Sequence, residues 1–566
     1  MPRLALLIFC LSVAAAAGFD LESAHPIDGA DGVPVSASLH LRFSEALDLE
    51  SLRHLRLQRV TEGGVPASEV AASEVAVGRA SDLTNAAITL SPRDFLVPGT
   101  RYEIRGTGAV KSKSGEALVP FVVRFTTGSQ EFAPDDRLVF EPETFDRTRS
   151  MTTVVFGPDR RLYAADAFGH LVVWDVGNDQ RPHNRQTLLD DPTESRQYID
   201  LEWDPEATAE NLVLWVSYAE RLAPEGDRHY FTGTIARLEI AVGAVGAGGV
   251  TERVVVAGLP HGRERQGGFE TLPHQPNGLV FKDGMLYQSV GSTSSSGGPA
   301  NWGVSEQALS ACILEIDYAR IDGTLDVHSG LGFDPSSQGS PVRVFATGVR
   351  NALEMVAHSN GRLYTAVNIN DRKGPGDGVP DHPDIPGDQN KLVTGTTPDH
   401  ESLYILERGR HYGFPNPVRG QFVLSGGNPT ADVDPFEIPD YPVGTPPDEG
   451  FAPDLIFPLW QYGGTSPNGM LEYLPRVSHP LRHALICCFY SAGDIAVMTL
   501  GEDGLPVAVE KLRGQMGKLQ LAGPLDITMD PESGTLYVAD FGKQAEFGAD
   551  GSMVMLRPAL RPGAGR

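Results

Sequence analysis

A short unit recurs along this chain and limits the folds that are open to it. Each copy holds an apolar stretch, a turn rich in Asp, Pro, Asn or Gly, and a second apolar stretch that often begins with Leu-Tyr. Because the stretches are short and no helical period separates them, they predict antiparallel strands. Six copies stand at residues 154–163, 201–218, 279–287, 355–364, 470–500 and 527–537, the fifth of them in degraded form.

Six such units, spaced at roughly fifty to a hundred residues, indicate a β-propeller of six four-stranded blades. Each blade of a propeller buries both faces against its neighbours, which explains why strands recur. A row of separate sandwiches fits less well, because no linker-like composition lies between the units. We expect the propeller to span residues 138–557.

The first part of the mature chain predicts a smaller unit over residues 19–128. Several of its stretches alternate apolar and polar side chains, which is typical of half-buried strands. Several short strands in about a hundred residues favour a β-sandwich, and a polar linker follows at residues 129–137. The expected fold class is therefore all-β, a sandwich followed by a six-bladed propeller. The predicted strands of the sandwich include residues 39–43, 87–92, 102–105 and 121–127.

Composition agrees with many short strands and restricts the partners. The 566 residues include 63 Gly and 43 Pro, which suit numerous turns. The formal net charge of −27 argues against nucleic acid and anionic membrane surfaces as partners, because both repel an acidic face.

The chain begins with features of an export signal. One basic residue precedes an apolar run that is too short to cross a bilayer, and small residues suited to cleavage follow. We expect residues 1–18 to be removed and the mature protein to be secreted or periplasmic, without a membrane span. Residues 558–566 are expected to form a disordered tail.

Three cysteines remain after the signal, which is too few for a disulfide framework. Cys487 and Cys488 lie in a strand-like apolar run, where neighbouring side chains face opposite sides. Two buried thiols are one interpretation. A vicinal disulfide, or a bond from one of them to Cys312, is the other.

An Arg-Asn pair at a strand-to-strand corner is the first candidate for chemistry. Residues 345–351 deliver Arg350 and Asn351 to a turn before the next apolar stretch. Guanidinium donates a fixed fork of hydrogen bonds that suits a planar, oxygen-rich ligand. The alternative is a turn in which both side chains bond only the local backbone. Two long insertions, at residues 371–399 and 422–458, are further places where function is expected.

Two resemblances to known families complete these observations. Over residues 19–128 the chain resembles the bacterial Ig-like domain of surface-layer and exported proteins, which implies a spacer or docking module. Four motifs, in order, resemble the glucose/sorbosone dehydrogenase propellers, soluble sugar dehydrogenases that use pyrroloquinoline quinone (PQQ). They are LPHQPNGL at 272–279, GVRN at 348–351, DHESLYILERGRHYGFP at 399–415 and SPNGMLEY at 466–473.

The second resemblance implies a PQQ- and calcium-dependent oxidation of an aldose to its lactone. It assigns to His274 the removal of the proton from the anomeric hydroxyl, and imidazole is the usual general base near neutral pH. Arg350 would act in catalysis and, with Asn351 and Trp460, in cofactor binding. Calcium would take oxygen ligands, and the candidates are Asn368, Asp399, Glu401 and the carbonyl of Tyr412. An ordinary loop histidine and solvated acidic loops remain the alternatives.

The chain also departs from this family. Before the last blade, where arginines are expected, it reads AGPLDI at 522–527, and no lysine stands in FYSAGDI at 489–495. PQQ carries three carboxylates, and leaving them without cationic partners in a cleft is costly. The catalytic corner is therefore retained better than the cationic clamp that would hold these anions. His411 replaces the usual Asn, and Ala352 the usual Pro.

Three functions therefore remain open. The first is a quinone-dependent sugar dehydrogenase with an unknown electron acceptor. The second is a non-catalytic extracellular propeller that binds a carbohydrate or a protein. The third is calcium-dependent lactone hydrolysis, which needs inward carboxylates at the ring axis, and the sequence shows no clear set of them.

Overall fold

The protein is described here from a computed structural model. The residues that it describes are 19–33, 39–60, 66–69, 75–79, 87–92, 96–128, 138–149, 151–221, 230–244, 247–262, 264–266, 269–271, 274–298, 305–328, 333–337, 339–368, 379–384, 401–430, 436–438, 441–459, 466–514, 517–519, 521–542 and 551–559. The predicted signal at 1–18 and the linker at 129–137 lie outside them.

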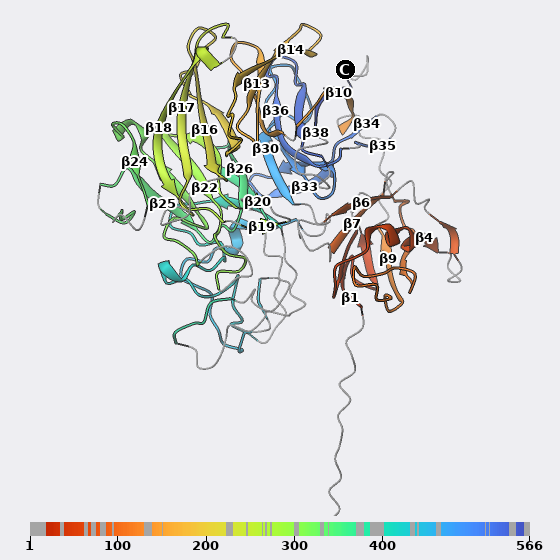
Figure 1. The fold of residues 1–566 in the computed structure, drawn as a ribbon. Coiled ribbons are helices and arrows are strands. Elements are labelled where there is room, and N and C mark those ends of the chain that lie inside the picture. Colours follow the sequence, from red (N-terminus) through yellow and green to blue (C-terminus); the bar gives the residue numbers. More distant parts are fainter. Residues whose placement is uncertain are drawn as a thin grey trace, which may run out of the picture.

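The N-terminal unit is a sandwich of two sheets (Figure 1). Its core holds apolar side chains from both sheets, among them the stacked rings of Tyr102 and Phe125, whose centroids lie 5.5 Å apart. One sheet has the order β1 (Leu21–His25), β3 (Leu39–Phe43), β7 (Ala87–Pro92) and β6 (Val75–Arg79). The other has the order β2 (Ala30–Val33), β9 (Phe121–Thr127), β8 (Arg101–Gly106), β4 (Arg56–Val60) and β5 (Pro66–Glu69).

Six further sheets follow, one for each predicted repeat, and they confirm the propeller. Blade 1 has β11 (Met151–Phe156), β12 (Arg161–Asp166), β13 (Leu171–Val176) and β14 (Pro182–Leu189). Blade 2 has β15 (Arg196–Trp203), β16 (Leu212–Glu220), β17 (Gly233–Ile240) and β18 (Val250–Leu259), with the short β24 (Leu325–Asp326) added in parallel. Blade 3 has β21 (Pro276–Lys282), β22 (Met285–Val290), β23 (Cys312–Ile316) and β25 (Val342–Thr347).

The remaining blades complete the ring. Blade 4 has β26 (Ala352–Ala357), β27 (Leu363–Val367), β28 (Ser402–Leu406) and β29 (Ile456–Pro458). Blade 5 has β30 (Pro467–Glu472), β31 (Leu485–Phe489), β32 (Asp494–Leu500) and β33 (Pro506–Lys511). Blade 6 has β36 (Pro524–Met529), β37 (Leu536–Asp540), β38 (Gly551–Pro558) and, as its outer strand, β10 (Phe140–Thr148).

The ring closes on itself in two ways. The innermost strands contact one another in the order β11, β15, β21, β26, β30 and β36, and β36 contacts β11 again. In addition, β10 pairs with β38 from Phe140 opposite Pro558 to Thr148 opposite Gly551. The first strand of the ring is therefore hydrogen-bonded to the last.

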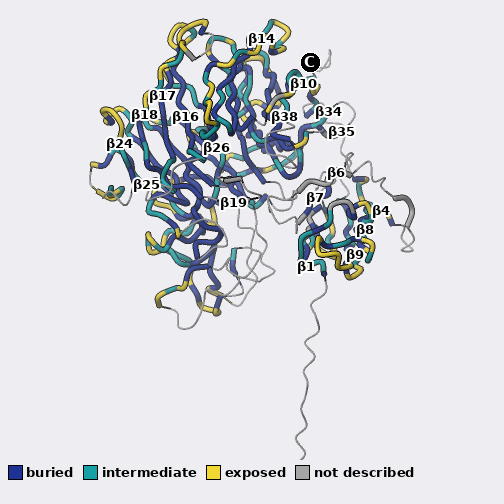
Figure 2. The backbone as a smooth tube through the Cα atoms, in the orientation of Figure 1, coloured by how far each residue is buried: buried dark blue, intermediate teal, exposed yellow. Residues whose placement is uncertain are grey.

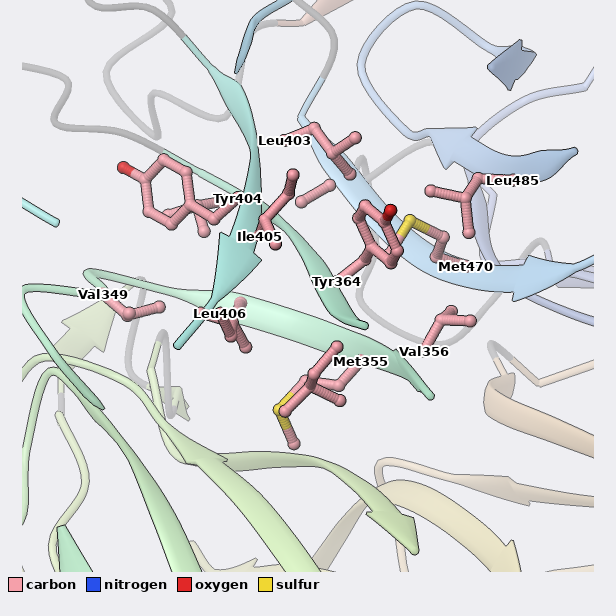
Figure 3. Packing of buried hydrophobic residues seen from close by; sticks show 14 of the residues in the cluster. Val349, Met355, Val356, Tyr364, Leu403, Tyr404, Ile405, Leu406, Met470 and Leu485 are labelled. Carbon is pink, nitrogen blue, oxygen red and sulfur yellow. The ribbon is translucent and has the colours of Figure 1, made fainter. Parts of the chain in front are cut away.

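The Leu-Tyr pairs explain why the repeat was visible in the sequence. Tyr364 in β27 is fully buried, and its hydroxyl donates to the Gly504 carbonyl in the next blade at 3.0 Å. Tyr537 in β37 donates in the same way to the Gln180 carbonyl of blade 1 at 2.7 Å. Each tyrosine thus fills the space between blades and satisfies its hydroxyl there. Figure 3 shows Tyr364 among buried residues from blades 4 and 5, including Met355, Leu403 and Met470.

Within the described residues the three cysteines, Cys312, Cys487 and Cys488, are buried thiols without a disulfide. Cys487 packs in the core that blade 5 shares with blade 4, and Cys488 packs in the core toward blade 6. The structure therefore agrees with the first interpretation, two buried thiols on opposite faces of one strand.

Buried backbone follows the sheets of the ring, and the exposed residues gather at turns and loops (Figure 2). Among the described residues no helix is long and apolar enough to cross a membrane.

Candidate active site

The site residues lie at one end of the ring, which we call the top face and define as the end where the innermost strands begin. His274 lies two residues before β21, and only 6% of its surface is exposed. Its Nδ1 lies 2.8 Å from Ser292 Oγ and 3.2 Å from the Ser292 carbonyl oxygen. Because Ser292 follows the paired strand β22, the fold brings the two together at the top of blade 3.

The contacts of Ser292 assign the tautomer of His274. The Ser292 hydroxyl donates its own proton to the Ser294 carbonyl oxygen at 2.7 Å, so its oxygen faces the imidazole as an acceptor. The Ser292 carbonyl can only accept. Both contacts therefore place the imidazole proton on Nδ1 and the lone pair on Nε2.

The surroundings also keep His274 neutral. Burial lowers its pKa well below the ordinary value, and the positive charge of Arg350 lowers it further, while the Ser292 carbonyl acts in the opposite direction. A neutral imidazole with its lone pair on Nε2 can accept a proton at neutral pH.

Arg350 stands at the corner between β25 and β26, as the sequence predicted. It is 8% exposed, and its Nε donates to the Ser295 carbonyl oxygen at 3.0 Å. Gly348 makes the corner with a φ of 76°, and a Cβ there would lie 2.6 Å from the His411 ring. Only glycine fits this position.

Three amide side chains join blades 3, 4 and 5 beside this corner. Asn277 Nδ2 donates to Asn351 Oδ1 at 2.7 Å, and the Asn368 backbone N–H donates to the Asn351 carbonyl at 2.9 Å. Asn368 Nδ2 in turn donates to the Pro467 carbonyl of blade 5 at 2.9 Å. Asn351 is therefore bonded by side chain and backbone, and it does more than cap its own turn.

Two buried acceptors at the site have no hydrogen-bond donor, namely Asn368 Oδ1 and Gln275 Oε1. A buried acceptor without a donor is costly. Hydroxyl groups of a ligand would satisfy both, because a hydroxyl donates as well as accepts.

A serine-rich loop that the sequence analysis did not single out supplies the partners of both His274 and Arg350, through Ser292 and Ser295. Residues 292–296 read Ser-Thr-Ser-Ser-Ser, and each of them is buried. The buried Glu306 carboxylate holds this loop, since it accepts from Ser294 N at 2.8 Å and from Ser294 Oγ at 2.5 Å. The run of hydroxyl residues directly after β22 was the available signal.

Three of the four residues predicted to bind calcium are described by the structure, and the calcium site stays a prediction. Asn368 and Glu401 flank Val367 and Ser402, which pair across β27 and β28, and Glu401 Oε1 accepts from Ser466 N at 2.7 Å. Tyr412 was predicted to contribute its backbone carbonyl, while its side chain faces β28, where its hydroxyl donates to the Ile405 carbonyl at 2.5 Å. Within the described residues no group of three or more His, Cys, Asp or Glu side chains is arranged to hold a metal ion. Asp399 and Trp460 lie outside these residues.

PQQ would need several cationic side chains around its carboxylates. Among the described site residues, Arg350 is the cationic side chain present. Lys511, at the end of the outer strand of blade 5, is buried and donates to Asp494 Oδ2 at 2.7 Å. Its charge is therefore neutralised within its own blade.

Carboxyl groups do converge on the ring axis, although no sequence pattern showed them. Asp200, Glu354 and Asp526 occupy the same position on the innermost strands of blades 2, 4 and 6. Burial raises the pKa of each, and the charge of Asp200 raises the pKa of Glu354 and Asp526 further. The equivalent residues of blades 3 and 5 are glycines, and a Cβ at Gly469 would lie 2.4 Å from Asp526 Oδ1.

Comparison with known proteins agrees with the two-part architecture. Residues 16–127 match the family model described as a bacterial Ig-like domain, which confirms the resemblance of the N-terminal unit. Among curated proteins, no sequence matches the chain.

Solved structures similar to the chain include several sugar dehydrogenases. A glucose dehydrogenase has 15% identity and a TM-score of 0.47, and the match covers 73% of this chain and 98% of that one. A putative oxidoreductase (glucose dehydrogenase) of Thermus thermophilus has 18% identity and a TM-score of 0.43, with 74% and 99% covered. The PQQ-bound aldose sugar dehydrogenase of Streptomyces coelicolor has 12% identity and a TM-score of 0.42, with 74% and 98% covered.

Proposed function

We propose that this chain, an Ig-like domain followed by a six-bladed ring, is an exported sugar dehydrogenase that oxidises an aldose at the anomeric carbon to a lactone. The observation that carries the proposal is the neutral His274 imidazole, with its proton fixed on Nδ1 by Ser292. The apolar run of residues 1–18 and the net charge of −27 support export in a soluble form.

His274 Nε2 would accept the proton of the anomeric hydroxyl while the hydrogen on the anomeric carbon leaves as hydride. The carbon–oxygen bond then becomes the carbonyl of the lactone. Arg350 would bind the oxygen on which negative charge develops, as a preorganised cation does in a buried site. Gln275 would accept from another sugar hydroxyl through its oxygen that has no donor.

PQQ, if bound, would accept the hydride as a two-electron acceptor. Arg350 and Asn351 would bind its quinone oxygens, because a guanidinium and an amide that are neighbours in the chain can both donate there. Calcium would add a positive charge, and Asn368 and Glu401 are the described candidates to bind it. The carboxylates of PQQ have no second cation among the described site residues, so cofactor binding is the step to test first.

A reconstitution experiment tests this proposal. The purified protein is titrated with PQQ in the presence of calcium, binding is followed by absorbance, and dye-coupled oxidation is measured over a panel of aldoses. We expect stoichiometric binding and turnover of at least one aldose. His274→Gln, the matched variant, is expected to bind PQQ and to lose turnover by about a hundredfold or more. A wild-type protein that binds no PQQ and oxidises none of the sugars would reject the proposal.

A second candidate function is favoured by the small number of cations in the described site, where Arg350 has no second arginine or lysine beside it. A ring that kept the amide cluster but lost the anion clamp would bind glycans without redox chemistry, with the Ig-like domain as a spacer. Glycan binding in the absence of PQQ, together with no PQQ binding at micromolar concentration, would support this alternative over the first.

A further inference from the structure

An arginine outside the site binds the segment of blade 3 that precedes β23. Arg419 ends the short η7 helix (Pro417–Arg419), in the segment that connects β28 to β29. Its Nη1 donates to the Ser310 carbonyl at 2.6 Å and to the Ala308 carbonyl at 3.0 Å. Its Nη2 donates to the Ala311 carbonyl at 3.1 Å. One guanidinium of blade 4 thus binds three carbonyls of blade 3.

The first path from Arg419 leads to His274. Ser310, whose carbonyl Arg419 binds, donates its hydroxyl to Glu306 at 2.5 Å. Glu306 holds Ser294, and the Ser294 carbonyl takes the proton of Ser292, which leaves the Ser292 oxygen to accept from His274 Nδ1. From Ser310 to His274 every residue in this path is buried.

The second path leads to Arg350. The Ala311 carbonyl that Arg419 binds also accepts from Gly348 N at 3.1 Å and from Val349 N at 3.2 Å. These two residues directly precede Arg350. Ala311 itself is fully buried with a φ of 50°, a strained conformation for a residue with a Cβ. It persists because its carbonyl and amide are bonded on several sides.

We propose that Arg419 is a positioning residue that sets the His274 tautomer and the place of Arg350 at the same time. The inference rests on the proposed function only where turnover is concerned. A lysine at this position cannot reproduce it, because an ammonium group is a point donor, whereas the guanidinium donates in a fixed fork to three carbonyls.

Arg419→Lys tests the inference, with Arg408→Lys as the matched control. Arg408 lies in the same segment but pairs with Glu315 and covers the Phe345 ring, away from the serine-rich loop. Asn416 keeps the segment docked in either variant, since its Nδ2 donates to the Gln307 carbonyl at 2.8 Å. The readout is the ¹⁵N spectrum of His274, assigned by its loss in His274→Gln, and the kcat and KM for the sugar.

In Arg419→Lys we expect a mixed His274 tautomer, a pKa closer to that of an ordinary histidine, and a kcat lower by roughly ten- to a hundredfold. Arg408→Lys should leave all three unchanged. An unchanged His274 spectrum in Arg419→Lys overturns the inference. If the wild type oxidises no sugar, the proposed function fails, but the imidazole signal still decides the role of Arg419.

A second variant covers the case in which Arg419→Lys does not fold. Glu306→Gln interrupts the same path one link closer to the site, because the amide cannot accept on both of its ends. We expect it to change the His274 spectrum as well. A folded Glu306→Gln with the wild-type His274 spectrum would equally overturn the inference.

Discussion

At the scale of single residues, the structure gives His274 the properties of a base by burying it and by fixing its neighbours. Desolvation and the charge of Arg350 both lower its pKa. A base with a lowered pKa stays in its reactive form when the solution becomes acidic, at the cost of being a weaker base. The two effects can be separated because Arg350 can be replaced while the burial is kept.

Arg350→Gln should therefore move the acid limb of the pH–rate profile. The wild-type kcat/KM is expected to stay level from pH 8 to well below pH 6.5, because His274 remains neutral there. Without the positive neighbour the pKa of His274 rises, so the acid limb of the variant should move toward pH 6.5, in addition to an overall loss of rate. A limb that stays in place would show that the base is another residue.

The sequence predicted a role for His274 and Arg350, but it did not predict the residues that hold them in place. The resemblance pointed to His274 and Arg350, because each stands within one of the quoted motifs. Glu306 and Arg419 are distant from them along the chain and follow no spacing rule, because their role depends on how the blade 4 segment lies on blade 3. The calcium candidates stay predictions, because Asp399 lies outside the described residues and the role given to Tyr412 belongs to its carbonyl oxygen.

At the scale of the elements, the innermost strands decide what lines the ring axis. Asp200, Glu354 and Asp526 stand on alternate blades, and Glu354 is hydrogen-bonded to Asp200. Glu354 and Asp526 are each the one acidic residue of their strand, and Asp200 shares its strand with Glu202, so none of the three stands out in sequence. Only the ring places the three together, which is why no pattern in the sequence revealed them. Burial and repulsion make their ionised forms unfavourable.

Glu354→Gln should consequently stabilise the ring at alkaline pH. The folded pKa of Glu354 is raised above the unfolded value, so wild-type stability falls as pH rises between the two values and stays low above them. The amide removes this charge and can still donate to Asp200. We expect a gain of more than about 1 kcal/mol at pH 8 and a smaller one at pH 5, measured by urea unfolding.

The control is Glu315→Gln, a buried carboxylate that differs in its partners. Glu315 pairs with both Arg343 and Arg408, so its replacement should destabilise the protein. A loss of stability in Glu354→Gln as well would show that the axial carboxyl is satisfied in its ionised form.

At the scale of the whole molecule, the sandwich and the ring have separate cores. The sequence predicted both, because each repeat carries its own strands and turns and these are local signals. The strand that closes blade 6 was not predicted, since its partner β38 lies about four hundred residues later in the sequence.

Phe140→Ala should weaken the ring without affecting the sandwich. Phe140 in β10 is fully buried, and its ring lies edge-on to Tyr473 with centroids 6.2 Å apart. Removing a buried phenylalanine costs about 3–5 kcal/mol. We expect calorimetry to show a lower melting temperature for the ring and an unchanged one for the sandwich. Phe125→Ala, in the sandwich core, should do the reverse.

The pairing of β10 with β38 also orders events in time. Arg557 bonds to Glu143 across 414 positions of the chain, so the residues of β10 leave the ribosome long before their partner exists. Until then β10 presents an unpaired edge, which invites pairing with other chains. In a newly made copy of this protein, β10 must therefore stay unpaired until β38 has been synthesised. A chain that stops short of residue 551 could not complete blade 6.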